Sequence, residues 1–472
     1  MDSLEKAFSY DVICLWGFSQ EEVKPLEGKS LIFFTQEFTS DLFTRVYYDR
    51  LACDLEYFQS LCEKEVFRTF FYVIHPSLPE EEKEIAKKWL GRCELLEWQV
   101  QLAASDYQDF GIKVFQNLCQ MRQRSFDEGS FPAIKNLFCN VPAFICGAGP
   151  SLEREVGNLK EAQNQGLIFA GGAALGSLGR LGVPIHVAAG IDPNPNYDKV
   201  LMQNAFEAPF FYQSRFASSL LQTVQGPLFQ VANNPGYTLE SWLQEGESFD
   251  GGWTVSTFCA AIAIHLGCNP IVFVGMDLSY GSEGEVGKDF VWEDPALGNL
   301  HTQKDWILAS KWLEGMTFSH KEHTFYTVSD KGLFIEGVKK TSFAEVRESA
   351  LFNEVDSEGL VHLLRSFWNP SEGYSKKIVV LEKSLDRSLV YIDALLQLFE
   401  KHYPKNPTGK GEFVLNLLDL QEEIAYQKIL IPVWNVWQYP LYRQFEDPYA
   451  REVNQLVFFK KVLQEYRMCV CK

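Results

Sequence analysis

The strongest constraint on the fold is a regular alternation of short apolar runs with helical stretches between residues 142 and 280. The predicted strands are 143–146, 167–170, 185–191, 209–212, 228–231 and 271–274, and the predicted helices between them include 173–181 and 254–266. Strands separated by helices at this spacing are joined by crossover connections, which place the strands parallel to one another. The pattern therefore predicts an α/β fold with a doubly wound, mostly parallel sheet.

The 472 residues exceed the roughly 100–200 that are typical of one domain, so we expect several domains. A small N-terminal α/β domain is predicted over 1–105, with strands at 12–16, 31–34 and 70–74 and helices at 38–58 and 79–90. The second domain, 106–350, contains the alternating region, a helical connector (102–124) at its start, a mobile loop (281–298) and a hairpin (324–335). Residues 351–472 are predicted to form a helical C-terminal domain.

Composition excludes several classes of partner. The formal net charge of −19 argues against duplex nucleic acid or an anionic membrane, since both bind basic surfaces. No apolar run approaches the ~20 residues needed to cross a bilayer, and the N-terminus lacks the features of a signal peptide. The eleven cysteines include no Cys-x-x-Cys pair, which is typical of reduced thiols. We therefore expect a cytoplasmic protein without a membrane span, a nucleic-acid partner or a structural zinc site.

The clearest local motif is Cys146-Gly147-Ala148-Gly149-Pro150-Ser151-Leu152, directly after a predicted strand and at the start of a predicted helix. Two glycines allow the backbone to turn tightly and to approach a ligand closely. Ser151 can cap the helix, whose free N–H groups would form an anion site. We therefore predict that Gly147, Gly149, Pro150 and Ser151 bind a phosphate. The alternative is that the glycines only form a tight turn.

The motif is not a dinucleotide fingerprint. Leu152 stands where the third glycine would be, and the second strand ends in Gly171-Gly172, where a carboxylate that binds ribose would be expected. A Walker loop is absent from the sequence as well. Hydride transfer is therefore disfavoured, while Gly171 and Gly172 remain in the predicted binding site.

Two aspartates follow predicted strands. Asp192 lies in Gly190-Ile191-Asp192-Pro193, and Asp277 lies in Gly275-Met276-Asp277-Leu278. Because the carboxyl ends of parallel strands face the ligand crevice, we expect both carboxylates at that edge, close to the glycine loop, as catalytic candidates. Capping of the following helix is the alternative role for Asp192.

A further glycine-rich segment, Gly251 to Thr257, opens the helix that precedes the last strand. Gly252, Thr254 and Ser256 suit anion or sugar-hydroxyl binding, or the hydroxyls serve only as caps. Between 143 and 280 the only basic residues are Arg154, Lys160, Arg180, Lys199 and Arg215. Helix N-termini would therefore do most of the phosphate binding, with a divalent metal such as Mg²⁺ on Asp192 or Asp277 as a hypothesis.

The histidines give weaker indications. His186 and His265 fall in apolar segments and are expected to be structural. His301, His320 and His323 lie near the predicted loop and hairpin, where each is either a surface residue or a general base brought inward by a lid.

Together these stretches resemble a known family. Cys146 to Leu152, Ile185 to Pro193, Gly251 to Thr257 and Gly275 to Tyr280 look like the central domain shared by Maf motility accessory proteins, which are similar to flagellin glycosyltransferases, and MptE-like 6-hydroxymethylpterin diphosphokinases. The stretch Tyr326 to Gly337 resembles the hairpin that closes this domain in the family. The resemblance covers about residues 110–350. The glycine–proline–serine loop is also similar to that of bacterial sialyltransferases that use CMP-activated sugars.

The resemblance implies a Rossmann-like core in which the glycine loop holds a nucleotide phosphate, while Asp192, the turn from Thr254 to Ser256 and Asp277 line the pocket. It implies a nucleotide-dependent transferase, either a Maf-like glycosyltransferase with a CMP-sialic-acid-like donor and a protein acceptor or a diphosphokinase that uses ATP. A binding protein that keeps the fold without the chemistry is the third alternative. The family commonly carries an aspartate where this chain has Gly171-Gly172-Ala173.

Overall fold

The computed structural model describes residues 6–26, 28–35, 44–48, 51–122, 127–195, 207–231, 238–243, 249–280, 290–294, 298–329, 331–349, 356–370, 375–442, 444–445 and 447–470. These residues cluster into two compact units. One comprises Met1–Asp109 and Leu389–Val462, and the other comprises Phe110–Ser388 and Leu463–Lys472.

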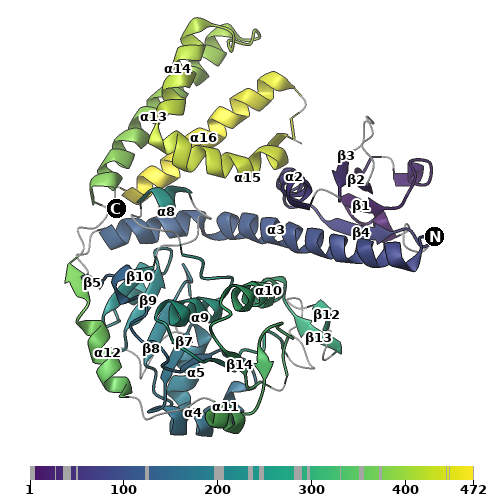
Figure 1. Cartoon of the computed structure of the whole chain (residues 1–472). Helices are drawn as coiled ribbons and strands as arrows, with labels where there is room; N and C mark the ends of the chain where they lie inside the picture. Colours follow the sequence, from purple (N-terminus) through teal and green to yellow (C-terminus); the bar gives the residue numbers. More distant parts are fainter. Residues whose placement is uncertain are drawn as a thin grey trace. The chain divides into compact units, whose positions relative to one another are not determined.

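The first unit begins with a four-stranded parallel sheet in the order β3-β2-β1-β4 (Figure 1). Its elements are β1 (Val12–Trp16), β2 (Ser30–Thr35), β3 (Thr44–Tyr47), α2 (Leu51–Lys64) and β4 (Phe70–Ile74), with a short 3-10 turn at Lys24–Leu26. Val12–Trp16 is buried throughout because all its side chains are apolar. The prediction of a helix over 38–58 was wrong in part, since 44–47 is a strand and the helix begins at Leu51.

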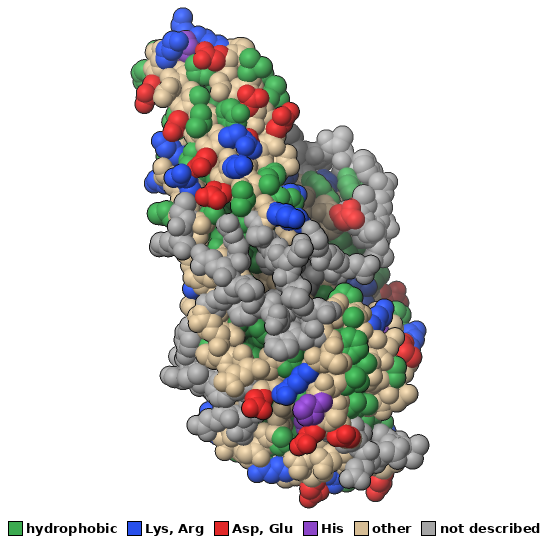
Figure 2. Space-filling view, turned by 90° about the vertical axis from the view of Figure 1, so that its left-hand side faces the viewer, with side chains coloured by type: hydrophobic (Ala, Val, Ile, Leu, Met, Phe, Trp, Pro, Cys, Tyr) green, Lys and Arg blue, Asp and Glu red, His purple; other side chains and the backbone are tan. Residues whose placement is uncertain are grey.

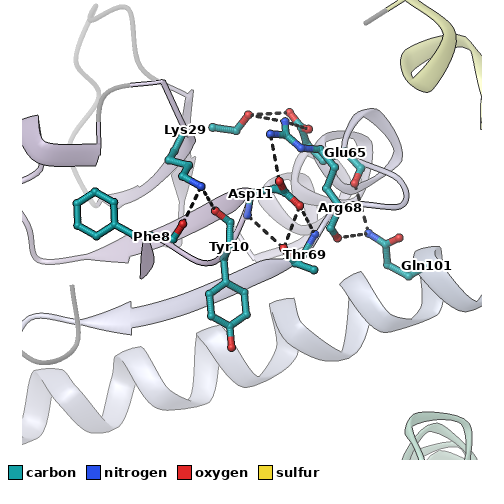
Figure 3. A network of polar contacts seen from close by, with 9 residues as sticks. Phe8, Tyr10, Asp11, Lys29, Glu65, Arg68, Thr69 and Gln101 are labelled. Carbon is teal, nitrogen blue, oxygen red and sulfur yellow. Dashed lines mark hydrogen bonds and ion pairs between the residues drawn. The ribbon is translucent and has the colours of Figure 1, made fainter. Parts of the chain in front are cut away.

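A polar network closes the amino edge of this small sheet (Figure 3). Asp11, just before β1, accepts hydrogen bonds from the amide and hydroxyl of Thr69, just before β4, at 3.0 and 2.9 Å. Lys29, just before β2, donates to the carbonyls of Phe8 and Tyr10. The network therefore ties together the points at which three strands begin.

The second unit contains a ten-stranded sheet in the order β15-β14-β11-β6-β7-β8-β9-β10-β5-β16, in which only β16 is antiparallel to its neighbour. Its strands are β5 (Asp127–Gly129), β6 (Ala143–Cys146), β7 (Leu167–Gly171), β8 (Val187–Gly190), β9 (Phe210–Gln213), β10 (Leu228–Val231), β11 (Ile271–Val274), β14 (Phe325–Thr327), β15 (Lys339–Lys340) and β16 (Trp368–Pro370). The predicted doubly wound, mostly parallel sheet is confirmed.

Helices cover both faces of this sheet, because its strands are apolar on both sides. One core contains strand residues such as Phe144 and Ile168 together with α4 (Val156–Ala162), α5 (Ala173–Leu181), α7 (Ser218–Leu221) and α11 (Phe343–Ser349). The other contains residues such as Ile145 and Phe169 together with α9 (Val255–His265), α10 (Lys304–Ser319) and α12 (Ser357–Arg365). Consecutive strand residues thus alternate between the two cores.

The remaining described helices are α3 (Glu80–Arg122), α8 (Thr238–Leu243), α13 (Ser375–His402), α14 (Gly411–Glu422), α15 (Ile431–Tyr442) and α16 (Pro448–Val470), with short helical turns at Pro132–Ile134, Leu152–Glu155 and Tyr426–Leu430. The helical C-terminal region is as predicted. In contrast, the two helices expected over 79–90 and 102–124 are one helix of 43 residues. Its start at Glu80-Glu81-Glu82 suits the positive end of the helix dipole.

Two local predictions need correction. Residues 324–335 do not form a hairpin, because β14 pairs in parallel with β11 and β15. The stretch 281–298 was predicted to be a mobile loop, but 281–289 and 295–297 lie outside the described residues. Its described part enters an antiparallel hairpin of β12 (Phe290–Asp294) and β13 (Gly298–Thr302).

One face of the described surface is mixed in charge (Figure 2). On the face drawn in Figure 2, acidic and basic side chains lie side by side over the coloured residues, without a continuous basic stripe. Among the helices described, none combines the length and apolar character needed to cross a membrane.

Candidate functional site

The strand order identifies the edge at which a ligand is expected. From β6 the chain proceeds through β7, β8, β9 and β10 in one direction, and β11 then returns to the other side of β6 and continues to β14. The topological switch point therefore lies between β6 and β11. In open α/β sheets, ligands bind beyond the carboxyl ends of the strands at such a point.

Asp277 follows β11 at this point and is held by two neighbouring segments. Its Oδ2 accepts a hydrogen bond from the amide of Ser151 at 2.9 Å. Its Oδ1 accepts from the hydroxyls of Ser151 and Ser329 at 2.5 and 2.6 Å. The residue is only 3% exposed. Asp277 therefore joins the ends of β6, β11 and β14 in one buried network.

The glycines of the first loop make this close packing possible. A Cβ on Gly147 would lie 2.4 Å from the carbonyl oxygen of Gly275, and one on Gly149 would lie 2.6 Å from Asp277 Oδ2. The amides of Gly147 and Gly149 donate to the carbonyls of Val274 and Gly275, each at 2.8 Å. Gly147 and Gly149 therefore form a tight turn, which is the alternative role that the sequence predicted for them.

The expected helix cap by Ser151 needs correction. Ser151 does not cap the helix, because its hydroxyl is bonded to Asp277, and a 3-10 turn precedes α4. Its amide, like those of Gly147 and Gly149, already has a protein acceptor, and Pro150 has no N–H. A phosphate that bound the amide of Ser151 would have to displace the Asp277 carboxylate, and the amino ends of neighbouring helices offer donors without such a competitor.

Two helix N-termini meet at the end of β7, the strand next to β6. A Cβ on Gly171 would lie 2.2 Å from Val255 Cγ2, so the first residue of α9 packs directly on the last residue of β7. Gly172 has φ 53° and forms the turn into α5. The amides of a first helical turn have no partner within the helix. The amino ends of α5 and α9 therefore bring such amides together beside the switch point.

At α9, Thr254 forms a capping box with Thr257, whose amide donates to Thr254 Oγ1 at 3.2 Å. The capping alternative is therefore confirmed for Thr254. The amide of Gly252 donates to Asp250 Oδ1 at 3.0 Å, so it has an acceptor as well. The amides of Val255 and Ser256 and the half-buried hydroxyl of Ser256 remain as candidate ligand donors at this end.

Asp192 lies at the same edge but not in the same cluster. It follows β8, and β6 and β7 separate β8 from β11, so Asp192 and Asp277 follow strands about 14 Å apart. Asp192 is exposed, and its Oδ1 accepts from the amide of Asn194 at 2.8 Å. The expected convergence with the glycine loop thus holds for Asp277 and fails for Asp192.

The surroundings of Asp277 do not suit the binding of Mg²⁺ by its carboxylate. Both carboxylate oxygens accept protein hydrogen bonds in a buried setting, whereas Mg²⁺ usually keeps several water ligands. The nearby thiol of Cys146 is no nucleophile either, because burial raises its pKa well above the ordinary value. We therefore assign no thiolate step to Cys146, and Asp192, which is exposed, stays the candidate for the predicted Mg²⁺.

The histidines lie elsewhere. His186 Nδ1 accepts from the amide of Ile168 at 2.9 Å, before β8, and burial lowers the pKa of His186 to about 4. His265 bonds to the carbonyl of Phe131, and burial lowers the pKa of His265 as well. Both are structural, as the sequence indicates. His301 is in β13, and His320 and His323 follow α10.

Sequence reasoning missed three buried polar groups at this edge. Ser329 completes the network of Asp277, and Ser214, just after β9, donates to the buried carboxylate of Glu240. Ser329 lies in the stretch from Tyr326 to Gly337 on which the resemblance partly rests, which could have singled it out. Nothing in the local sequence marks Ser214 or Glu240.

Comparison with known proteins supports the resemblance. Residues 113–283 match the family model described as 6-hydroxymethylpterin diphosphokinase MptE-like. The fold is similar to that of the MAf glycosyltransferase from Magnetospirillum magneticum AMB-1, with a TM-score of 0.54 and 13% sequence identity over 98% of this chain and 78% of the other. No curated protein matches the chain. The likeness of the central domain to the Maf and MptE-like group is therefore confirmed, and at this identity the structural similarity shows a shared fold.

Proposed function

Because the central domain matches the MptE-like family and the chain has a Maf-like fold, we propose that this protein is a nucleotide-dependent transferase. Its donor phosphate binds at the joined amino ends of α5 and α9. The observation that carries the proposal is the packing of Val255 on Gly171 and Gly172. This packing brings together the amino ends of α5 and α9, the positive ends of their helix dipoles, beside the switch point.

The donor we propose is a CMP-activated sugar of the sialic-acid type, and the acceptor is a protein. A CMP-sugar carries one phosphate, whose single charge two helix N-termini can bind without basic side chains. ATP carries several charges and usually requires Mg²⁺ and lysine or arginine. The region 143–280 has only five basic residues, and Asp277 already accepts three protein hydrogen bonds.

Diphosphate transfer from ATP to 6-hydroxymethyl-dihydropterin is the second candidate, and the family match over 113–283 favours it. The Maf-like fold extends over 98% of the chain, and it therefore includes the regions outside that match. These flanking regions favour the glycosyltransferase, because additional domains give a surface on which a protein acceptor can bind.

A thermal-shift comparison tests the donor. CMP and CMP-sialic acid should raise the melting temperature by mass action, while ATP with Mg²⁺, GTP and the pterin should have little effect. Stabilisation by ATP and pterin alone would replace the first candidate with the second. Stabilisation by none of these compounds would favour a non-catalytic protein.

A substitution that adds a negative charge at the amino end of α5 tests where the phosphate binds. Ala173 is exposed at the first position of α5. Ala173→Asp should weaken CMP-sugar binding at least about tenfold, or about 1.4 kcal/mol, because it introduces a negative charge beside the phosphate. The same change favours the helix itself, so folding should be retained. Ala173→Asn is the matched neutral control and should bind nearly as the wild type does. Equal binding by both variants would contradict the proposed location.

A further inference from the structure

A second polar cluster lies at the opposite ends of the strands, where α10 ends and the chain turns into β14. His320, Glu322 and His323 occupy this turn, and one potential ligand atom from each lies within 4.8 Å of the others. The Nδ1 atoms of His320 and His323 lie 3.3 and 3.2 Å from Glu322 Oε1. Two imidazoles and a carboxylate thus converge within four consecutive residues.

The two separations between a histidine nitrogen and the Glu322 oxygen match edges of a tetrahedral metal site. Nitrogen and oxygen ligands lie about 2.0–2.1 Å from Zn²⁺, so two of them at tetrahedral angles are about 3.3 Å apart. Both separations, 3.3 and 3.2 Å, are close to this length. A plain hydrogen-bonded cluster of the same residues has similar spacing, and the experiment below distinguishes the two.

The turn that carries the cluster is held in place by the backbone. The amide of His320 donates to the carbonyl of Met316, and that of His323 donates to the carbonyl of His320, each at 3.0 Å. The next amide, of Thr324, donates to Asn269 Oδ1 at 2.9 Å. Since the backbone is already ordered, metal binding would cost only the ordering of three side chains.

The cluster also borders a pocket of about 640 Å³ that α9 and α10 line in part. Ile264 and Met316 contribute apolar walls, and Trp312 donates to Asp250 Oδ2 across another part of the lining. All three residues of the cluster line this pocket. A metal held by three protein ligands beside a pocket keeps one coordination position open, as in catalytic zinc sites.

We propose that His320, Glu322 and His323 bind a divalent transition-metal ion, with Zn²⁺ as the best-matched ion. A water, or an oxygen of a molecule in the pocket, takes the fourth position. Two imidazoles with one carboxylate suit Zn²⁺, whereas Mg²⁺ and Ca²⁺ require oxygen ligands. The site lies before β14, at the amino edge of the sheet, and it is therefore separate from the proposed nucleotide site.

The test is calorimetric titration of the full chain, first stripped of metal by a chelator, with Zn²⁺. The wild type should bind one equivalent at this site. His320→Ala and His323→Ala should each weaken binding more than about 100-fold, because loss of an outer-shell partner alone costs about 10–100-fold. His362→Ala removes an exposed histidine of α12 and should bind as the wild type does. Absence of wild-type binding, or unchanged binding by both cluster variants, would overturn the proposal.

X-ray absorption of the zinc-loaded wild type gives a test that needs no variant. The proposal expects nitrogen and oxygen ligands at about 2.0–2.1 Å with imidazole scattering and no sulfur at about 2.3 Å. A sulfur shell would assign the ion to the cysteines and overturn the proposal. Neither measurement depends on transferase activity.

Discussion

The two parallel sheets of this chain place their polar networks at opposite edges. The small sheet joins Asp11, Lys29 and Thr69 at its amino edge, before its strands begin (Figure 3). The large sheet joins Ser151, Asp277 and Ser329 at its carboxyl edge, after its strands end. In open α/β sheets, nucleotide-type ligands bind beyond the carboxyl ends of the strands, and only the network of the large sheet lies at that edge. The comparison thus supports the proposal of a nucleotide site in the large sheet.

The networks also differ in burial. The side chain of Asp11 is 45% exposed, whereas Asp277 is 3% exposed. Water can replace lost partners at the first site but not at the second. Equivalent substitutions should therefore have unequal effects in the two sheets, and the following predictions test this inequality.

The largest effect is expected for Asp277→Ala. It leaves the amide and hydroxyl of Ser151 and the hydroxyl of Ser329 without their buried acceptor, which should lower the free energy of unfolding by about 3–5 kcal/mol. Hydrogen-exchange mass spectrometry of peptides from β6 and β11 measures this loss locally. Asp277→Asn keeps one acceptor and should lose less. A loss below about 1 kcal/mol for the alanine variant would mean that the two networks are equivalent.

A smaller effect is expected for Gly171→Ala. The new Cβ would lie 2.2 Å from Val255 Cγ2 and 2.9 Å from the carbonyl oxygen of Ala189, so α9 must shift away from β7. Overpacking of this kind costs about 1–3 kcal/mol, and separation of the two helix N-termini should also abolish stabilisation by CMP-sugar. Urea denaturation and thermal shift measure the two results.

The matched control for this glycine is Gly157→Ala in α4, where a Cβ meets no atom within 4 Å. This variant should be as stable as the wild type or more so, since alanine favours a helix. If Gly171→Ala retained full ligand-induced stabilisation, the junction of α5 and α9 would not be the binding site.

The fold was accessible from the sequence where local pattern decides it. Runs such as 143–146 and 271–274 are apolar and bounded by proline and glycine, and each is a strand with the predicted limits. The pairing of strands was harder to predict from the sequence. The segment 324–335 was expected to pair with itself, yet β14 pairs with β11, about fifty residues earlier. No local sequence pattern indicates which distant strand β14 pairs with.

The site shows the same division between local and long-range information. Asp192 and Asp277 were placed at the correct edge, because the residue after a parallel strand must lie there. Their separation depends on strand order, which puts β6 and β7 between them. Ser329, which follows β14, was identified as a partner of Asp277 only from the tertiary structure. The structure gives a physical reason for Gly171, because Val255 packs directly on its backbone.

The amino edge of the large sheet offers a third test, through pH. Burial lowers the pKa of His186 to about 4, so the native state keeps this side chain neutral while the unfolded chain protonates near 6.5. Stability is therefore full above pH 6.5 and is lost as pH falls from 6.5 to about 4. At pH 5.5 the loss should be about 1.4 kcal/mol. Exchange of the Ile168 amide, which donates to His186 Nδ1, reports it. His186→Gln should lack this pH dependence, and an equal response in both proteins would contradict it.

The smallest effect is expected for Asp11→Asn in the small sheet. The hydrogen bond from the Thr69 amide lowers the pKa of Asp11 below its usual value, so the carboxylate contributes stability above pH 3.8 and loses it as pH falls through its native pKa. Because the side chain is nearly half exposed, the substitution should cost below about 1 kcal/mol, measured by exchange in β1 and β4. The difference from wild type should vanish in acid, in contrast with His186, which already responds at pH 5.5. A cost as large as that of Asp277→Ala would show that the amino-edge network is as strongly stabilising as the buried one, and the proposal of a nucleotide site in the large sheet would then need support from ligand titration alone.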